Sequence, residues 1–96
     1  MRESTIENYL VRRVKNFGGQ CYKWVSPSNS GVPDRIVLLN RRVSFVELKA
    51  PGKKPRALQM VTLERLASAG YHTVVIDSKE GVDLLIHDLM EEGGEV

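Results

Sequence analysis

The 96-residue sequence contains little cysteine and no long hydrophobic run. Its single cysteine, Cys21, excludes an internal disulfide and a structural zinc site built from several thiolates. No segment approaches the roughly 20 apolar residues of a membrane span, and a start with Arg2 and Glu3 is unlike a secretory signal. We therefore expect a cytoplasmic protein, and any metal ion that it binds is expected to be held by oxygen ligands.

Basic residues are missing from the last part of the chain. All 14 Lys and Arg lie in residues 1–79 together with six of the 12 acidic residues, whereas residues 80–96 contain the other six acids. The basic part suits a polyanionic partner such as nucleic acid, although lysines that are merely solvated give the same count. The composition, 42% hydrophobic and 27% charged, provides for one core, so we expect residues 1–96 to form a single domain.

Apolar spacing and turn residues predict an α/β fold in the order αβββαβα, with a central mixed four-stranded sheet flanked by helices. Ser4 and Glu7 have the spacing of a capping box, and Gly18 ends the first helical pattern. Ser78 or Asp77 is expected to cap the last helix, and residues 91–96 are expected to fray. The helices are predicted at residues 4–17, 55–70 and 78–90, and the strands at residues 20–25, 34–39, 43–49 and 71–76.

The second and third predicted strands form a hairpin across residues 40–42. An even-numbered loop centred between residues 41 and 42 puts Asp34 opposite Lys49 and Ile36 opposite Glu47. Opposite residues share a face of the sheet, as do residues two apart along a strand. Asp34, Glu47 and Lys49 are therefore expected to project together.

These three residues form a constellation suited to a divalent cation. Two carboxylates that converge on one sheet face repel each other unless a positive ion lies between them. Oxygen ligands suit Mg²⁺ or Mn²⁺, which complete their coordination with water or phosphate oxygens. The alternative is that Asp34 merely starts a strand and that Glu47 and Lys49 form an exposed pair. The apolar neighbours Phe45 and Leu48 favour the metal site, because they indicate a central strand in which charges need a partner.

Glu7 and Gln59 add two side chains that have alternative interpretations. Glu7 lies on the apolar stripe of the first predicted helix, where it either reaches the same metal ion or is the reciprocal half of a capping box with Ser4. Gln59 precedes Leu63 and Leu66 by four and seven residues, so it points an amide toward the sheet. Such an amide either belongs to the site or bonds a backbone group.

One ordered motif runs through most of the chain. Its parts are Gly31-Val32-Pro33-Asp34, then Glu47-Leu48-Lys49 followed by Pro51-Gly52, and Gln59 on the next predicted helix. This set resembles the VRR-NUC (virus-type replication-repair nuclease) family of the PD-(D/E)XK nuclease superfamily. The resemblance implies a restriction-endonuclease-like fold and a Mg²⁺- or Mn²⁺-dependent DNA endonuclease. It implies further that Asp34 and Glu47 bind the metal ion and that Lys49 is the catalytic lysine. The resemblance also implies that Glu7 and Gln59 belong to the catalytic residues, together with Lys49.

The resemblance also suggests a substrate and an assembly. Small members of the family look like homodimeric phage or prophage enzymes that cut branched DNA such as Holliday junctions. A homodimer is expected because one site cuts one strand, whereas a symmetric junction needs two matched cuts. The rival interpretation is a non-catalytic DNA-binding or replication-assembly interaction module of the same fold.

Residues next to the motif are assigned by their position. The carbonyl of Leu48 is expected to be a further metal ligand, because Leu48 lies between Glu47 and Lys49. Lys49 orients or deprotonates the attacking water, or stabilises the phosphate, and the sequence does not choose between these roles. The basic residues expected to contact DNA phosphates are Lys53, Lys54 and Arg56.

Overall fold

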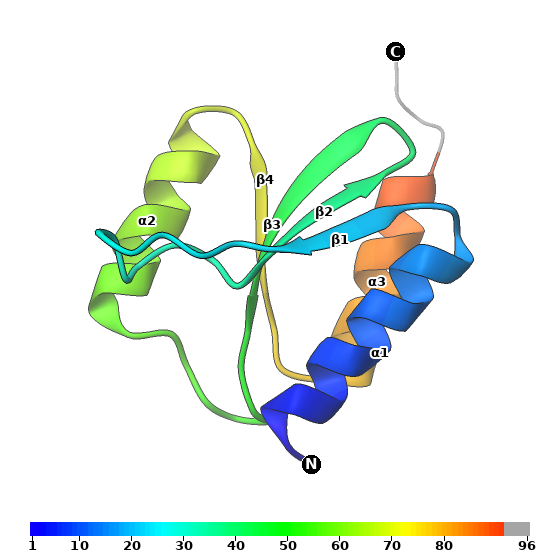
Figure 1. Ribbon diagram of the computed structural model, residues 1–96, viewed down its shortest axis with the longest axis horizontal. Coiled ribbons are helices and arrows are strands. Elements are labelled where there is room, and N and C mark those ends of the chain that lie inside the picture. The colour runs from blue at the N-terminus through cyan, green and yellow to red at the C-terminus, as the bar shows by residue number, and fades with distance from the viewer. Residues whose placement is uncertain (92–96) are drawn as a thin grey trace.

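The computed structural model describes residues 1–91 and contains, within that range, three helices and four strands (Figure 1). The elements are α1 (Glu3–Asn16), β1 (Gln20–Lys23), β2 (Arg35–Leu39), β3 (Arg42–Leu48), α2 (Ala57–Ser68), β4 (His72–Ile76) and α3 (Lys79–Met90). The predicted order αβββαβα is confirmed. Residues 92–96, part of the segment expected to fray, lie outside the described range. No helix within residues 1–91 is long and apolar enough to cross a membrane.

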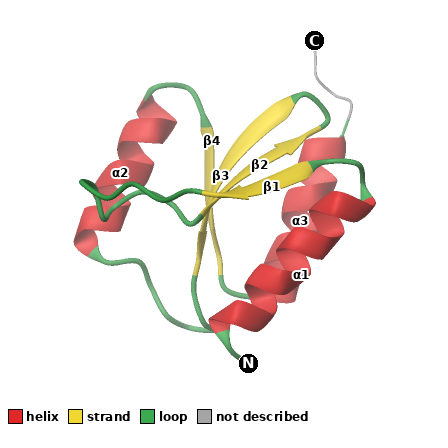
Figure 2. Ribbon diagram, in the orientation of Figure 1, coloured by secondary structure: helices red, strands yellow, loops and turns green. Residues whose placement is uncertain are grey.

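The four strands form one mixed sheet, as predicted, and they lie in it in the order β1-β2-β3-β4. The first three strands are antiparallel neighbours, and β4 runs parallel to β3. Parallel neighbours need a crossover connection, and α2 provides it on one face of the sheet. The helices α1 and α3 lie side by side on the other face (Figure 2).

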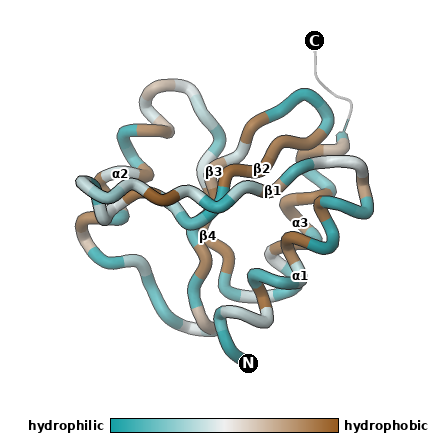
Figure 3. Tube along the Cα trace, viewed as in Figure 1, coloured by the Kyte–Doolittle hydropathy of each residue, from teal (hydrophilic) through white to brown (hydrophobic). Residues whose placement is uncertain are grey.

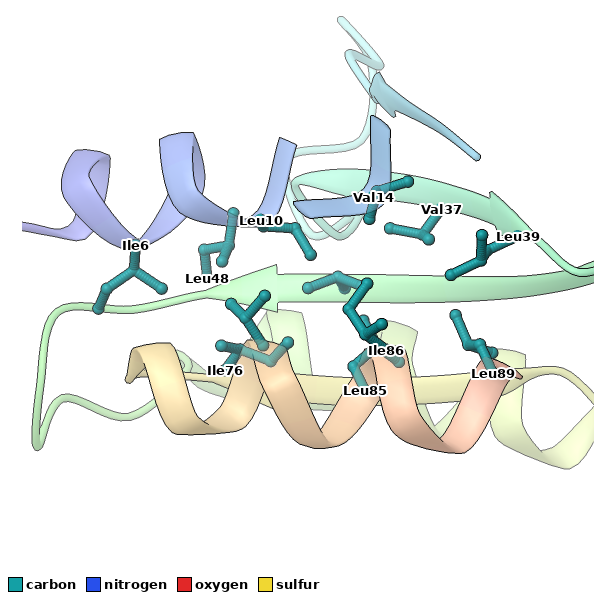
Figure 4. Close-up of a cluster of buried hydrophobic side chains, with 12 residues drawn as sticks. Ile6, Leu10, Val14, Val37, Leu39, Leu48, Ile76, Leu85, Ile86 and Leu89 are labelled. Carbon is teal, nitrogen blue, oxygen red and sulfur yellow. The ribbon is translucent and has the colours of Figure 1, made fainter. Parts of the chain in front are cut away.

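The hydrophobic core lies between α1, α3 and one face of the sheet (Figure 4). The apolar residues that α1 contributes are spaced four apart and line one side of the helix: Ile6, Leu10 and Val14. Strand alternation sends Val46 and Leu48 of β3 into this core, so the intervening Glu47 faces the opposite side of the sheet. β3, β4 and α3 contribute apolar residues to the same core, and the trace coloured by hydropathy marks the apolar residues along the chain (Figure 3).

The helix starts confirm one predicted cap and contradict the other. In α3 the Oγ of Ser78 accepts a hydrogen bond of 3.0 Å from the N–H of Gly81, so Ser78 is the N-cap residue. The helix α1 begins at Glu3, and no side chain within residues 1–91 caps it. The predicted capping box was wrong, because Ser4 already lies inside the first turn and Glu7 has another partner, described below.

The β2–β3 hairpin turns one position earlier than predicted. Leu39 pairs with Arg42, which leaves Asn40 and Arg41 as a two-residue turn. Both turn residues have positive φ, 56° and 64°, as a type I′ turn requires. Asn adopts this left-handed conformation at little cost, which explains why the chain reverses before residue 42.

The earlier turn shifts the register of the whole hairpin. Ile36 pairs with Phe45, and continuing the ladder to its open end puts Asp34 opposite Glu47. The predicted pairs of Asp34 with Lys49 and of Ile36 with Glu47 were therefore wrong. The loop length is even, as predicted, so Asp34 and Glu47 still share one face of the sheet.

Candidate active site

Asp34 and Glu47 lie together where β2 begins and β3 ends. The Oδ2 of Asp34 accepts a hydrogen bond of 2.9 Å from the backbone N–H of Leu48, which ties the two strand ends to each other. The hairpin register puts both carboxyl groups on the face of the sheet that looks away from α1 and α3. The structure thus brings together the two acids that the sequence pattern singled out.

The carboxyl group of Glu47 is buried. Only 1% of the residue is exposed, and its Oε1 has no hydrogen-bond partner among the described residues. The Nζ of Lys49 lies 3.2 Å from Oε2 of Glu47 and forms an ion pair with it. Burial, and then the charge of Asp34, raises the pKa of Glu47, and Lys49 offsets part of this rise. A buried carboxylate with open acceptor positions is chemically suited to bind a cation.

Glu7 lies on the other side of the sheet from this pair. Its Oε2 accepts a hydrogen bond of 2.9 Å from Nε of Arg35, and the two side chains form a half-buried ion pair. Arg35 follows Asp34 directly, and strand alternation sends their side chains to opposite faces. Arg35 therefore binds Glu7 on the side of the sheet that α1 covers. Neither interpretation of Glu7 from the sequence, metal ligand or capping box, included Arg35 as its partner.

Glu3 is the acid of α1 whose charge is coupled to the carboxylate pair, and the sequence pattern did not single it out. Partial desolvation, and then the charge of Asp34, raises the pKa of Glu3. Glu3 also contributes to the raised pKa of Glu47. The sequence did contain a signal for Glu3, because Glu3 lies one helical turn before Glu7, at the N-terminal end of the same helix. Reading Ser4 as the cap placed Glu3 outside the helix and concealed this signal.

Gln59 is buried on α2 and bonds the backbone. Its Oε1 accepts a hydrogen bond of 2.8 Å from the N–H of Arg56, the N-cap residue of the helix. Of the two interpretations from the sequence, the structure shows this backbone contact. Gln59 thereby closes the first turn of α2 next to the loop that follows β3.

The loop between β3 and α2 places basic side chains in solvent. Its exposed cations are the residues predicted to contact DNA, Lys53, Lys54 and Arg56. The Oδ2 of Asp77, just after β4, accepts a hydrogen bond of 3.1 Å from the N–H of Gly52 and so holds the loop to the sheet. The loop runs from the end of β3 to the start of α2 (Figure 1). It leaves β3 next to Lys49, so it begins at the end of the strand that holds Glu47.

Gly31 packs the segment before Asp34 against α2. A Cβ atom at this position would lie 2.8 Å from Oγ1 of Thr62 and 3.0 Å from the carbonyl oxygen of Leu58. Backbone atoms of a helix do not yield to such a contact, so the close approach requires glycine. The Gly31-to-Asp34 part of the motif therefore fixes the path by which the chain enters β2.

The fold and the site together define the class of protein. Within residues 1–91, no group of three or more His, Cys, Asp and Glu side chains forms a candidate metal site. The described site is a pair of acids with a lysine at the open end of a β-hairpin, in an αβββαβα chain with a mixed sheet. This arrangement is that of the PD-(D/E)XK nuclease superfamily.

Comparison with known proteins identifies the family within this class, although no family model matches the sequence. The chain is 47% identical over 81 residues to "Putative nuclease p44" of Acyrthosiphon pisum secondary endosymbiont phage 1. The matched residues cover 83% of this chain and 87% of that protein. A solved VRR_NUC domain matches it with a TM-score of 0.82 at 33% identity, covering 88% of this chain and 94% of the other. The protein belongs to the VRR_NUC family.

A second solved structure, a VRR_NUC domain protein, agrees in fold. Its TM-score is 0.78 at 20% identity, and the match covers 94% of this chain and 88% of that one. The αβββαβα arrangement is thus shared at low sequence identity.

Proposed function

We propose that this protein is a divalent-metal-dependent endonuclease that hydrolyses phosphodiester bonds in DNA. The observation that carries the proposal is the buried carboxyl group of Glu47, which shares a sheet face with Asp34 and whose Oε1 has no hydrogen-bond partner among the described residues. Two adjacent acids repel each other, and the single positive charge of Lys49 offsets this only in part when one acid is inside the protein. Membership of the VRR_NUC family supports nuclease chemistry at this pair.

The donor set fits Mg²⁺ or Mn²⁺. Asp34 and Glu47 would supply carboxylate oxygens, and the main-chain carbonyl of Leu48 a further ligand. In a strand the N–H and C=O of one residue point toward the same neighbouring strand, and the N–H of Leu48 points at Asp34. Glu3 of the first helix would add negative charge near the pair without being a third ligand, because no group of three such side chains within residues 1–91 could hold a metal ion. Bound there, the ion would supply Lewis acidity and a lowered pKa for the attacking water.

The cationic side chains act on the DNA backbone in this proposal. Lys49, paired with Glu47, contacts the scissile phosphate or the attacking water. Lys53, Lys54 and Arg56 bind the neighbouring phosphates, which gives an affinity that falls with salt and carries no base information. Gln59 acts indirectly, because it holds the first turn of α2 beside this loop.

We further propose that the substrate is branched DNA, such as a Holliday junction, and that two copies act together. One site cuts one strand, and a two-fold homodimer supplies the second cut of a symmetric junction. The edge strand β1, with exposed Tyr22, and the outer side of α3, with exposed Leu84, are candidate contact surfaces. Sedimentation tests the assembly, and a monomeric mass together with full junction cleavage would contradict it.

The nuclease proposal is tested with purified protein on four-way-junction, flap and linear duplex DNA, in Mg²⁺, Mn²⁺ or EDTA. Cleavage is expected in either metal and not in EDTA. Asp34→Ala is expected to abolish cleavage while DNA binding survives, because the loop cations remain. Glu64→Gln, which removes an exposed acid of α2, is the matched control and should cut normally. Metal-independent cleavage, or full activity of Asp34→Ala, would refute the proposal, and DNA binding with no cleavage would favour the binding-module interpretation.

A further inference from the structure

A cavity of about 570 Å³ opens between the β3–α2 loop, α2 and the end of β4. Its lining includes Lys53, Lys54, Pro55, Met60, Val75 and Asp77. The volume falls within the range of roughly 300–1,000 Å³ that is usual for small-molecule sites. No residue of the carboxylate pair lines the cavity, so it is separate from the proposed metal site.

The cavity nevertheless lies beside that site. Val75 of β4 is the register partner of Glu47 in the parallel β3–β4 ladder. Partners on neighbouring strands are about 4.8 Å apart and point to the same face of the sheet. The wall formed by Val75 is therefore next to the buried carboxyl group of Glu47, and a ligand in the cavity would lie adjacent to a phosphate at the site.

The cavity combines an apolar wall with a cationic rim. Met60 and Val75 are 40% and 39% exposed, so the fold leaves apolar surface uncovered here. The exposed side chains of Lys53 and Lys54 carry the positive charge of the rim. The one acid in the lining, Asp77, already accepts a hydrogen bond from Gly52, which shapes the loop.

We propose that this cavity binds one unpaired nucleotide next to the scissile phosphate, and so selects DNA in which a base can leave the stack, as at a flap or a branch point. A nucleotide joins a flat base, whose faces pack on apolar surfaces, to an anionic phosphate, which matches the apolar wall and the lysine rim. In a continuous duplex the bases are stacked and paired, so they are not available to enter. The part of this proposal that places the nucleotide next to a cleaved bond rests on the proposed nuclease function. Binding of a nucleotide in the cavity does not depend on that function.

The first test measures DNA binding in EDTA, where the proposed cleavage is off. Fluorescence anisotropy compares a duplex with a short unpaired flap against a blunt duplex of equal charge. The wild-type protein is expected to prefer the flap by about tenfold. Val75→Phe fills the cavity and is expected to remove this preference. Val61→Phe, at a position of α2 that is 41% exposed and outside the lining, should retain it.

The second test uses the wild-type protein and so does not depend on a variant that folds. Deoxyadenosine monophosphate is titrated while backbone amide shifts are recorded by NMR, with abasic deoxyribose phosphate as the comparison. Saturable shifts at Gly52 and Val75 with the nucleotide alone would support the proposal. Equal shifts with the abasic compound would overturn the proposal and indicate a site for phosphate alone. Shifts that appear only as the protein concentration rises would also overturn it and indicate that a second copy of the chain occupies the cavity.

The two proposals fail in different ways. Metal-dependent cleavage with equal affinity for flap and blunt DNA would leave the nuclease function standing and refute the nucleotide cavity. A flap preference that Val75→Phe removes, in a protein that cuts no DNA, would support the cavity and refute the nuclease.

Discussion

The Nε of Arg35 donates a hydrogen bond of 2.9 Å to Oε2 of Glu7, and this ion pair joins α1 to β2 through the half-buried space between them. Arg35 also donates to the carbonyl oxygen of Cys21 in β1, at 3.3 Å. A single side chain thus connects a helix and two strands directly behind Asp34. Glu7 acts through this contact to hold the frame of the site, because the Arg35 that it binds follows Asp34 directly in the chain.

Glu7→Gln is expected to destabilise the fold by about 1–3 kcal/mol, because Arg35 loses a charged partner in a half-buried position. Urea unfolding in EDTA measures the loss, with the exposed-site variant Glu64→Gln as the control. The affinity for Mn²⁺, followed by calorimetry on the folded protein, should change little. Unchanged stability together with lost Mn²⁺ binding would show instead that Glu7 is a ligand.

The stability of the metal-free protein is expected to fall with rising pH on account of Glu47. The folded-state pKa of this carboxyl is raised by burial and by Asp34, whereas its ordinary value is 4.5. A raised acid contributes stability that is fully present below pH 4.5 and is lost as the pH rises through the folded pKa. Glu47→Gln should abolish this loss, so thermal unfolding in EDTA should show the variant gaining on the wild type above pH 4.5. Parallel curves for the two proteins would contradict the prediction.

The hairpin turn offers a stabilising substitution. Arg41 has φ 64°, a conformation that costs an ordinary residue roughly 1–2 kcal/mol, and glycine adopts it freely. Because glycine also loses more entropy on folding, Arg41→Gly is expected to stabilise by about 0.5–1 kcal/mol, measured by thermal unfolding. Arg42→Gly is the comparison and should destabilise, because Arg42 lies in β3 and donates to the carbonyl oxygen of Asp88 at 2.8 Å. A loss of stability in Arg41→Gly would argue against the type I′ turn.

Gly31→Ala is expected to destabilise by about 1–3 kcal/mol, because its Cβ would lie 3.0 Å from the carbonyl oxygen of Leu58 in α2. The displaced segment leads into Asp34, so Mn²⁺ affinity should fall as well. Ser30→Ala, at the exposed neighbouring position, is the control and should leave both properties unchanged. Wild-type stability and Mn²⁺ affinity in Gly31→Ala would show that the close approach to α2 is not required.

The fold was predictable to a large extent because its signals are local. Helical spacing identified the buried stripe of α3, and Ser78 marked where that helix begins. The turn at Asn40 and Arg41 was misplaced by one residue, since three successive polar residues offered two positions for an even loop. The error moved each pair along the ladder but not from one face to the other, because side chains alternate with a period of two.

The candidate site was predictable in its strand residues and not in its helical ones. Asp34 and Glu47 lie on adjacent strands of a hairpin, so their spacing along the chain determined that they share a face. Whether Glu3 or Glu7 approaches them depends on how α1 docks across the sheet. That docking is decided by the pairing of Glu7 with Arg35 and by the core beneath the helix, and no local pattern records either contact.

The sequence alone determined the order of elements, the apolar faces that form the core, and the shared face of the two strand carboxylates, because each follows from a period of two or of about 3.6 residues along the chain. Only the tertiary structure decided that Glu47 is buried beside Lys49 and that Gln59 bonds the backbone. It also decided that Val75 borders a cavity beside the site. These features depend on which distant segments lie next to one another, and packing free energy summed over the whole chain selects that arrangement.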